Sequence, residues 1–316
     1  MHRAATPLAL LLPLLTLRDA SAAANSTALR EQYIRMVEWT VTGSINDEAG
    51  RCDQARSGDC SKLTKYDAKM RQEGTDWPPF AHTMIGHIRL HTVRMAIEAV
   101  MRDKVPGDFV ELGSWRGGCG IYAKAIFFAY GELQRRVHLF DVFGPIAGYS
   151  WAGHFLEVPV AQVQHNFEKY GLFDDDVELH QGKFVDTLSD FYERHRKADS
   201  LRIAVLRIDS NSIDSHQDAF FYMYEFVPVG GWVLFDDVIA EKNLLKWWKS
   251  VCETQGICYE LKGDTRGAWF QKTSVQLIDF TKAAPARDHN KGYEQALGHA
   301  SGRAVRAATR ARAAVN

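Results

Sequence analysis

The sequence predicts an α/β protein built on a doubly wound, mainly parallel sheet. From residue 105 onward, short apolar and β-branched runs alternate with stretches of helical length, as in sheets whose parallel strands are joined by helices. Two runs, 203–209 and 232–237, stay apolar until their last residue or two and then end in aspartate. A carboxylate that ends a buried strand lies at the carboxyl edge of the sheet, where open α/β folds bind their ligands.

The elements are expected in the following order along the chain. The predicted strands are 108–112, 137–142, 177–180, 203–209, 232–235, 258–261 and 268–271. The predicted helices of this part are 118–130, 159–170, 183–197, 216–226 and 240–255. The last two of the seven strands have no helix between them, so we expect an antiparallel hairpin at one edge of the sheet.

The N-terminal part is expected to be helical and to pack on the sheet. Helical spacing of apolar residues predicts helices at 26–41 and 83–102, whereas 43–77 is expected to be loop with a short helix. In the second helix the apolar stripe consists of Leu90, Val93, Ile97 and Val100. We expect its polar flanks to face solvent, namely Arg89, Arg94, Glu98 and Arg102.

The two ends of the chain differ in composition from the rest. A basic start, the apolar run 4–17 and small residues at 19–24 have the layout of a secretory signal peptide. A retained anchor, a disordered extension and an organelle-targeting extension are the alternatives. The Ala- and Arg-rich residues beyond 282 are expected to form a disordered tail. The formal net charge of −1 gives no reason to expect nucleic acid or an anionic membrane as a partner.

A secretory route makes the five cysteines informative. Cys52 with Cys60, and Cys252 with Cys258, can each form a local disulfide in an oxidising compartment. Cys119 would then remain as a buried thiol. The chain has no C-x-x-C spacing, so a zinc ribbon is disfavoured.

The strand-end aspartates are candidate metal ligands. If the two strands are neighbours, Asp209, Asp236 and Asp237 come together and repel one another unless a cation lies between them. Ligation by oxygen alone suits Mg²⁺ or a similar hard ion. The alternative is three solvated loop acids.

A glycine-rich turn follows the first strand and opens a helix. Glycines at 113, 117 and 118 allow a ligand to approach the backbone, and the helix start offers free N–H donors. The spacing is G-x-x-x-G-G rather than G-x-G-x-x-G, which favours a nucleoside without a pyrophosphate, S-adenosylmethionine, over NAD. A turn that binds no ligand is the alternative.

Two later turns are candidates for the same ligand. Asp141 ends the second strand, the position from which such folds hold ribose hydroxyls, although it can equally cap the next segment. Gly182 and Phe184 follow the third strand and can flank an adenine ring or form a plain turn.

Three segments together resemble one known family. Residues 76–86 read D-W-P-P-F-A-H-T-M-I-G, residues 106–108 lead to W-R-G-G at 115–118, and V-G-G at 229–231 leads to Asp236 and Asp237. In this order the motifs resemble the macrocin O-methyltransferase family, over roughly residues 32–272. The resemblance implies a class I methyltransferase fold with an N-terminal helical lid, which transfers methyl from S-adenosylmethionine to a hydroxyl of a sugar or other vicinal diol.

The resemblance also implies roles for individual residues. S-adenosylmethionine would lie over the glycine turn, with the segment 83–85 across it. The expected cofactor contacts are Thr83, Met84, Ile85, Glu111, Gly113, Ser114, Trp115, Gly118, Asp141, Gly182 and Phe184. The expected ligands of Mg²⁺ are Asp209, Asp236 and Asp237, and the ion would clamp two vicinal oxygens and lower the pKa of the substrate hydroxyl.

At one position the chain departs from the family. Sugar-modifying relatives carry Asp-Gly-Asp after the fourth strand, and the second acid looks like their general base. This chain has Asp209, a serine and Asn211, and an amide cannot take up a proton near neutral pH. His216 is a substitute base or a plain surface histidine; His82 and His154 are weaker candidates, and direct loss of the proton to water is another route. A protein that binds cofactor and metal without turnover is the alternative function.

These arguments divide the chain into four parts. We expect a signal peptide at 1–24, the helical lid region at 25–104, the methyltransferase domain at 105–275 and a basic tail at 276–316. The partner would be a small-molecule or glycan diol, in the secretory pathway, with no stable membrane span once the signal is removed. The helical front end is also a plausible surface for a homo-oligomer.

Overall fold

The sheet of this protein has seven strands in the order β5-β4-β3-β6-β7-β9-β8. The computed structural model describes residues 12–50, 52–54, 59–145, 155–210 and 212–282. The strands are β3 (Asp108–Leu112), β4 (Val137–Asp141), β5 (Val177–Gln181), β6 (Ile203–Ile208), β7 (Trp232–Phe235), β8 (Lys262–Gly263) and β9 (Ala268–Gln271). The first five are parallel, and the pairs β7–β9 and β8–β9 are antiparallel. The predicted doubly wound sheet with an antiparallel edge hairpin is therefore confirmed.

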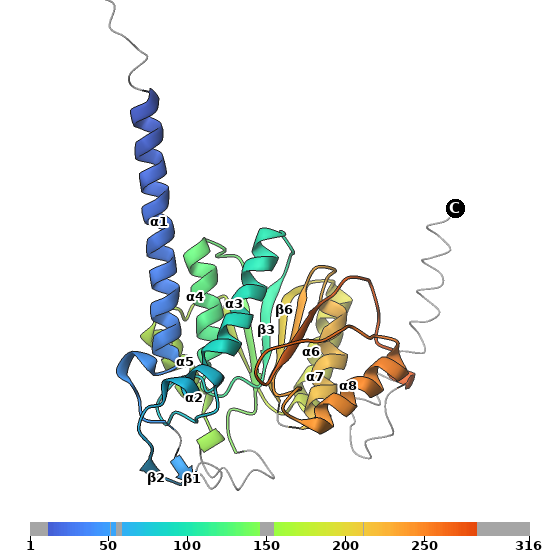
Figure 1. The fold of residues 1–316 in the computed structure, drawn as a ribbon. Coiled ribbons are helices and arrows are strands. Elements are labelled where there is room, and N and C mark those ends of the chain that lie inside the picture. The colour runs from blue at the N-terminus through green and yellow to red at the C-terminus, as the bar shows by residue number, and fades with distance from the viewer. Residues whose placement is uncertain (1–11, 51, 55–58, 146–154, 211, 283–316) are drawn as a thin grey trace, which may run out of the picture.

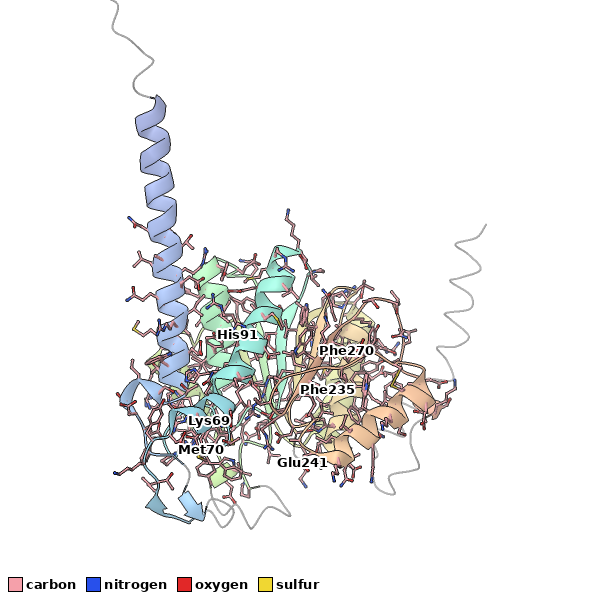
Figure 2. All side chains as sticks on the ribbon, in the orientation of Figure 1. Lys69, Met70, His91, Phe235, Glu241 and Phe270 are labelled. Carbon is pink, nitrogen blue, oxygen red and sulfur yellow. A yellow bond between two sulfur atoms is a disulfide. The ribbon has the colours of Figure 1, made fainter. Side chains whose placement is uncertain are left out.

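Helices cover both faces of this sheet (Figure 1). They are α1 (Leu12–Val41), α2 (Ala68–Glu73), α3 (Gly86–Arg102), α4 (Gly118–Tyr130), α5 (Val160–Lys169), α6 (Phe184–Ala198), α7 (Ile213–Met223) and α8 (Lys242–Gln255). Apolar residues of α1, α3, α4 and α5 share one core with one face of the sheet, and those of α6, α7 and α8 share a second core with the other. In the second core Phe235 of β7 and Phe270 of β9 lie side by side, with ring centroids 6.0 Å apart (Figure 2).

The edge hairpin begins later than the sequence predicts. Residues 258–261 are not a strand, and β8 is only Lys262–Gly263. A tight turn sets this register, because the Asp264 carboxylate accepts the backbone N–H groups of Arg266 and Gly267. The predicted disulfide between Cys252 and Cys258 is present, and it ties the end of α8 to the segment that leads into the hairpin. Cys119 is a buried free thiol, as predicted.

The N-terminal part packs on the sheet domain as expected, but its details differ. Helix α1 runs without a break from Leu12 to Val41, through the expected end of the signal peptide. A small antiparallel sheet of β1 (Cys52–Gln54) and β2 (Asp59–Leu63), which the sequence did not predict, lies in the polar stretch. The side chains of Cys52 and Cys60 are outside the described part. No helix in the described ranges combines the length and apolar character that a membrane span needs.

The expected boundary of the tail is wrong. Residues 276–282 still belong to the folded domain, and they end in a short 3₁₀ helix, Phe280–Lys282. Ile278 and Phe280 are buried, and the Phe280 ring contacts Tyr192 and Tyr222 at centroid distances of 5.9 and 5.7 Å. The domain therefore extends at least to Lys282, and the predicted disorder beyond it lies outside the described residues.

Gly113 joins the turn after β3 to the end of β6. Its φ is +94°, and a Cβ at this position would overlap the carbonyl oxygen of Asp209. Only glycine satisfies both conditions, because it tolerates positive φ and leaves room for the neighbouring strand end. The close approach brings the glycine turn directly beside the first of the strand-end aspartates.

We expect Gly113→Ala to destabilise the fold by more than backbone strain alone, which costs about 1–3 kcal/mol. Gly131→Ala is the matched control, since Gly131 has φ +75° at the end of α4 but no atom within 4 Å of the added Cβ. Urea unfolding of both variants measures the difference. Equal losses would show that the contact between Gly113 and Asp209 is not tight.

Candidate functional site

The three predicted metal ligands meet at the carboxyl edge of β6 and β7, where two arginines bind them. The Nη2 atom of Arg207 is 2.9 Å from Oδ2 of Asp209 and 3.2 Å from Oδ1 of Asp236. The Nη1 atom of Arg89 is 2.6 Å from Oδ2 of Asp236 and 3.9 Å from Oδ1 of Asp237. The prediction that these acids lie at one edge is thus fulfilled, with guanidinium groups between them.

Arg207 is the central cation of this cluster. It is buried inside β6, and its Nη1 atom donates to Oε1 of Glu111 on the neighbouring strand β3 at 2.6 Å. Burial raises the pKa of Glu111 to about 7, although Arg207 opposes that rise. The ion pair with Arg207 shows that Glu111 helps to hold β3 and β6 together below the glycine turn. The expected contact of Glu111 with the cofactor remains a prediction.

Arg89 was expected in solvent, and this expectation is wrong. The side chain is buried at the start of α3, because it crosses from the lid region to Asp236 on the sheet. Its other donors bind the carbonyl oxygens of Ile85 at 2.7 Å and Gly74 at 2.9 Å. The apolar stripe of α3 predicts which face of the helix is buried. It does not predict that Arg89, at the border of that face, pairs with the strand-end carboxylate of Asp236.

The aspartates differ in their affinity for protons. Burial would raise the pKa of Asp236, but Arg89 and Arg207 outweigh it and hold this pKa at about 2. Burial and the adjacent Asp236 carboxylate raise the pKa of Asp209 well above its ordinary value. Burial and the Asp236 carboxylate also raise the pKa of Asp237. Arg266, whose Nε is 2.6 Å from Oδ1 of Asp237, lowers this pKa but does not outweigh them.

This donor set fits a hard cation in its chemistry, since excess carboxylate charge is crowded at one edge. Within the described ranges, however, Asp209, Asp236 and Asp237 do not bring one oxygen each within 4.8 Å of one another. The contacts with Arg89 and Arg266 hold two of them. An ion that used all three carboxylates would therefore have to displace at least one arginine contact.

The glycine turn is organised by Asp141 at the end of β4. Its Oδ2 atom accepts the backbone N–H groups of Ser114 at 2.8 Å and Trp115 at 2.9 Å. The Oγ atom of Ser114 is buried and has no hydrogen-bond partner among the described residues. A buried hydroxyl without a partner next to a strand-end acid fits a polar ligand such as the ribose or amino acid part of S-adenosylmethionine.

The lid segment lies against this turn. The N–H of Gly118, the first residue of α4, donates to the carbonyl oxygen of His82 at 3.0 Å, and a side chain at position 118 would overlap that carbonyl. Thr83 and Ile85 are buried and Met84 is partly buried. These three residues therefore lie between the glycine turn and the Arg89 contact, and their position across the cofactor stays a prediction.

Three aromatic residues surround the turn, and of these the sequence singled out only Trp115 as a cofactor contact. Phe155 stacks on Trp77 and lies against Trp115, both with ring centroids 5.3 Å apart, and the indole N–H of Trp115 donates to the Phe155 carbonyl at 2.9 Å. The sequence offered one signal for this aromatic cluster, namely that two of the family motifs each contain a tryptophan, at positions 77 and 115. Their meeting point, Phe155, follows a stretch without any recognisable pattern.

The turn after β5 also lies next to Asp141. The Gly182 N–H donates to the Asp141 carbonyl oxygen at 2.9 Å. Phe184 is the first residue of α6 and packs partly buried against the core. The two residues thus lie beside the expected ribose position, and their contact with adenine stays a prediction.

No described histidine is an open proton acceptor at this edge. His216 is fully buried; its Nδ1 atom lies 2.6 Å from Oγ of Ser210, and burial lowers its pKa to about 4. His82 is paired with the Tyr170 hydroxyl at 2.9 Å, and burial lowers its pKa to about 4 as well. His216 is therefore not the surface histidine of the alternative interpretation, and its role as a base stays a prediction. Asn211 and His154 lie outside the described residues.

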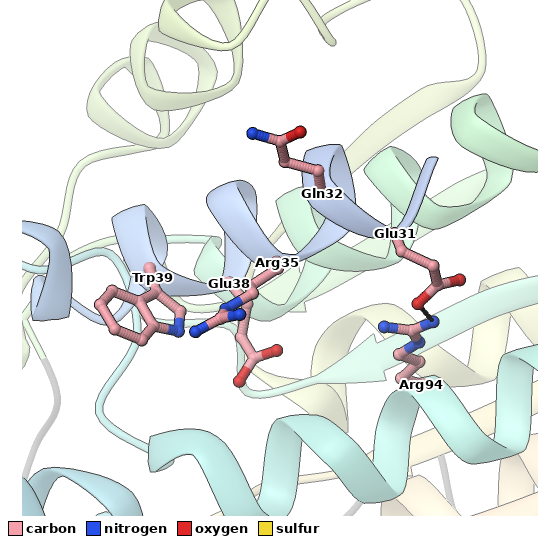
Figure 3. A pocket seen from close by; sticks show the side chains of 6 residues that line it. All are labelled: Glu31, Gln32, Arg35, Glu38, Trp39 and Arg94. Carbon is pink, nitrogen blue, oxygen red and sulfur yellow. Dashed lines mark hydrogen bonds and ion pairs between the residues drawn. The ribbon is translucent and has the colours of Figure 1, made fainter. Parts of the chain in front are cut away.

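A separate hollow lies between α1 and α3 (Figure 3). Glu31 faces Arg94 across it, with 2.6 Å between Oε2 and Nη2, whereas Gln32 points away from this pair (Figure 3). The side chains that line it are Glu31, Gln32, Arg35, Glu38, Trp39 and Arg94. None of them belongs to the carboxylate edge or the glycine turn, so this hollow is not the candidate active site.

The strand order, the glycine turn after β3 and the acids after β4, β6 and β7 define a methyltransferase of class I fold. The chain belongs to the macrocin O-methyltransferase family, because the family model described as Macrocin-O-methyltransferase (TylF) matches residues 51–272. It is accordingly an enzyme that transfers a methyl group from S-adenosylmethionine to oxygen.

The relatives that this chain matches are named as O-methyltransferases. The 8-demethyl-8-(2,3-dimethoxy-alpha-L-rhamnosyl)-tetracenomycin-C 4'-O-methyltransferase of Streptomyces olivaceus is 39% identical over 54% of this chain and 68% of its own length. The mycinamicin III 3''-O-methyltransferase of Micromonospora griseorubida is 35% identical over 66% of this chain and 83% of its own. The solved structure of the O-methyltransferase NovP, 29% identical, superposes with a TM-score of 0.68 over 78% of this chain and 100% of its own.

We expect Arg89→Leu to destabilise the protein by about 3–5 kcal/mol, because it leaves the buried Asp236 carboxylate without one of its two cations. Arg102→Leu is the control, since that arginine pairs with Asp103 at the exposed end of the same helix. Thermal unfolding followed by circular dichroism measures both. A loss for Arg89→Leu no larger than that of the control would contradict the role assigned to Arg89.

Proposed function

We propose that this enzyme methylates a hydroxyl of a sugar or another vicinal diol, with a divalent cation such as Mg²⁺ at Asp209, Asp236 and Asp237. The observation that carries the proposal is the contact of Gly113 with the Asp209 carbonyl, which joins the glycine turn to the carboxylate edge. A methyl donor on the turn and an acceptor hydroxyl at the edge would therefore be neighbours. Such positioning is a main source of rate in group transfer.

The protein's own groups would hold the methyl donor. Ser114 offers a free buried hydroxyl, Asp141 a carboxylate beside the turn, and Thr83 to Ile85 close the opposite side. The cation, when bound, would acidify the acceptor hydroxyl and fix two vicinal oxygens. Before the cation binds, Arg89 and Arg266 would hold the carboxylates of Asp236 and Asp237 in place. When it binds, these arginines would give up some of their contacts so that the carboxylates can ligate the cation.

Ser210 is the group through which a proton can leave the acceptor. It directly follows Asp209, and its hydroxyl contacts Nδ1 of the buried His216 at 2.6 Å. The serine hydroxyl would accept the substrate proton while its own proton passes to Nδ1 of His216, and the pair would replace the acid that is missing at position 211. Because burial lowers the pKa of His216 to about 4, this route depends on a cation that acidifies the acceptor hydroxyl. This route gives His216 a role at the site although it is fully buried.

We also propose that the protein enters the secretory pathway through residues 1–24. The basic start, the apolar run and the small residues at 19–24 support this proposal. Mass spectrometry of the mature N-terminus, after expression in the native host, is expected to show a start near residue 25. A mature chain that begins at Met1 would contradict it.

A turnover assay tests the methyl transfer. With a panel of diol-bearing glycosides, we expect transfer from S-adenosylmethionine that stops with EDTA and returns with Mg²⁺. Asp237→Asn should lower kcat by roughly 10²-fold or more if the cation is catalytic. Asp199→Asn is the control and should leave kcat unchanged, because Asp199 is an exposed acid at the end of α6 that pairs with Arg202.

Ser210→Ala in the same assay separates the proton route from binding: kcat should fall while the KM for S-adenosylmethionine stays the same. Calorimetry that shows tight S-adenosylmethionine binding, with no transfer under any divalent ion, would contradict the enzyme proposal. That result would favour a binding protein.

A further inference from the structure

A second group of metal-ligating side chains lies on the face of the sheet that α6 covers, away from the carboxylate edge. His138 is on β4, and Glu178 and His180 are on the edge strand β5. Residues two apart on a strand point to the same face, so Glu178 and His180 share one face. His138 is the register partner of Glu178 across the parallel pair, which brings the third side chain beside them.

The donor atoms of the three side chains converge on one point. The Nδ1 atom of His138 is 3.2 Å from Nε2 of His180 and 3.5 Å from Oε2 of Glu178, and those two atoms are 3.6 Å apart. A tetrahedral zinc ion with bonds of about 2.0–2.2 Å separates its ligands by roughly 3.3–3.5 Å. The triangle formed by the three atoms therefore has the size of one face of a zinc coordination shell.

The surroundings of His138 add an independent argument. Its second ring nitrogen, Nε2, is 3.5 Å from Oδ2 of Asp108 at the start of β3. Histidines that bind a metal through one nitrogen commonly direct the other to a carboxylate, which fixes the ring and strengthens the ligand. Asp108 is held in turn, because its Oδ1 atom accepts the Arg136 backbone N–H at 2.9 Å.

Burial leaves one side of the group open. The His138 side chain is 3% exposed, whereas those of His180 and Glu178 are 21% and 34% exposed. Phe140 stacks on His180 at 4.1 Å, and the Phe191 ring meets it edge-on at 5.1 Å. Apolar rings thus hold the ligands on the protein side, while water can reach a fourth position from outside.

We propose that His138, Glu178 and His180 bind one zinc ion, with Asp108 as the carboxylate that orients His138. Two imidazoles and one carboxylate suit Zn²⁺ and disfavour Mg²⁺, which prefers oxygen ligands. The ion would clamp the edge strand β5 to β4. Among the described residues, the carboxylate edge of β6 and β7 offers carboxylate oxygens as ligands, so the two sites would select different metals.

The experiment uses the full chain, freed of metal by a chelator and titrated with Zn²⁺ in a calorimeter. We expect one zinc per chain, a higher melting temperature with zinc and, with Co²⁺ instead, the intense visible absorption of a tetrahedral site. Glu178→Gln and His180→Ala should weaken binding at least about tenfold and remove the Co²⁺ absorption. Asp108→Asn should weaken binding about 10–100-fold.

Two controls separate this site from others. His165→Ala removes a histidine that meets Glu168 at 3.5 Å on α5 and should leave zinc binding unchanged. Asp237→Asn should also leave it unchanged, because the carboxylate edge is a different site. Glu178→Gln preserves the size of a half-exposed side chain, so it tests the ligand even if His180→Ala fails to fold. Zinc binding by Glu178→Gln that equals the wild type, or no zinc binding at all, would overturn the proposal.

Discussion

The buried guanidinium group of Arg207 is the interaction on which the centre of this molecule depends. It binds Glu111, Asp209 and Asp236, and so joins the three central strands β3, β6 and β7 below the carboxyl edge. Without it, three carboxylates would lie together in a poorly solvated place, at a cost of several kcal/mol. The fold tolerates the acids that make the edge suitable for a cation because this arginine neutralises part of their charge.

Arg89 extends the same network into the N-terminal part. One side chain holds two backbone carbonyls of the lid region and one carboxylate of the sheet. Arg89 therefore links the packing of this N-terminal region to the charge of the carboxylate edge. A ligand that competed with Arg89 for Asp236 would also remove one contact between the two parts.

Much of the architecture follows from local pattern. The strand at 108–112 and the helix at 118–130 agree with the structure at both ends, since apolar periodicity and a glycine at position 131 define them locally. The order of acids after the strands also predicted the carboxylate edge. These features depend on residues close in sequence, or on the general rule that parallel strands end at one edge.

Contacts that depend on long-range register could not be predicted in this way. Arg89 meets Asp236 across 147 positions, and no local signal distinguishes it from Arg102, the exposed arginine of the same helix. His138 meets His180 across 42 positions, and only the alignment of β4 with β5 brings them together. The short strand β8 was misplaced because a side-chain turn at Asp264, rather than apolar alternation, sets its start.

The short hairpin strand has a consequence for how molecules of this protein meet one another. An open sheet edge is a template on which a second chain can add a strand. At one edge β8 has only two residues, both exposed, and a disulfide just before it restrains the chain that leads there. At the other edge β5 carries the polar side chains of Glu178 and His180. Neither edge of the sheet therefore presents a long apolar strand. Aggregation of the protein by edge-to-edge strand pairing is disfavoured for this reason, even at high concentration.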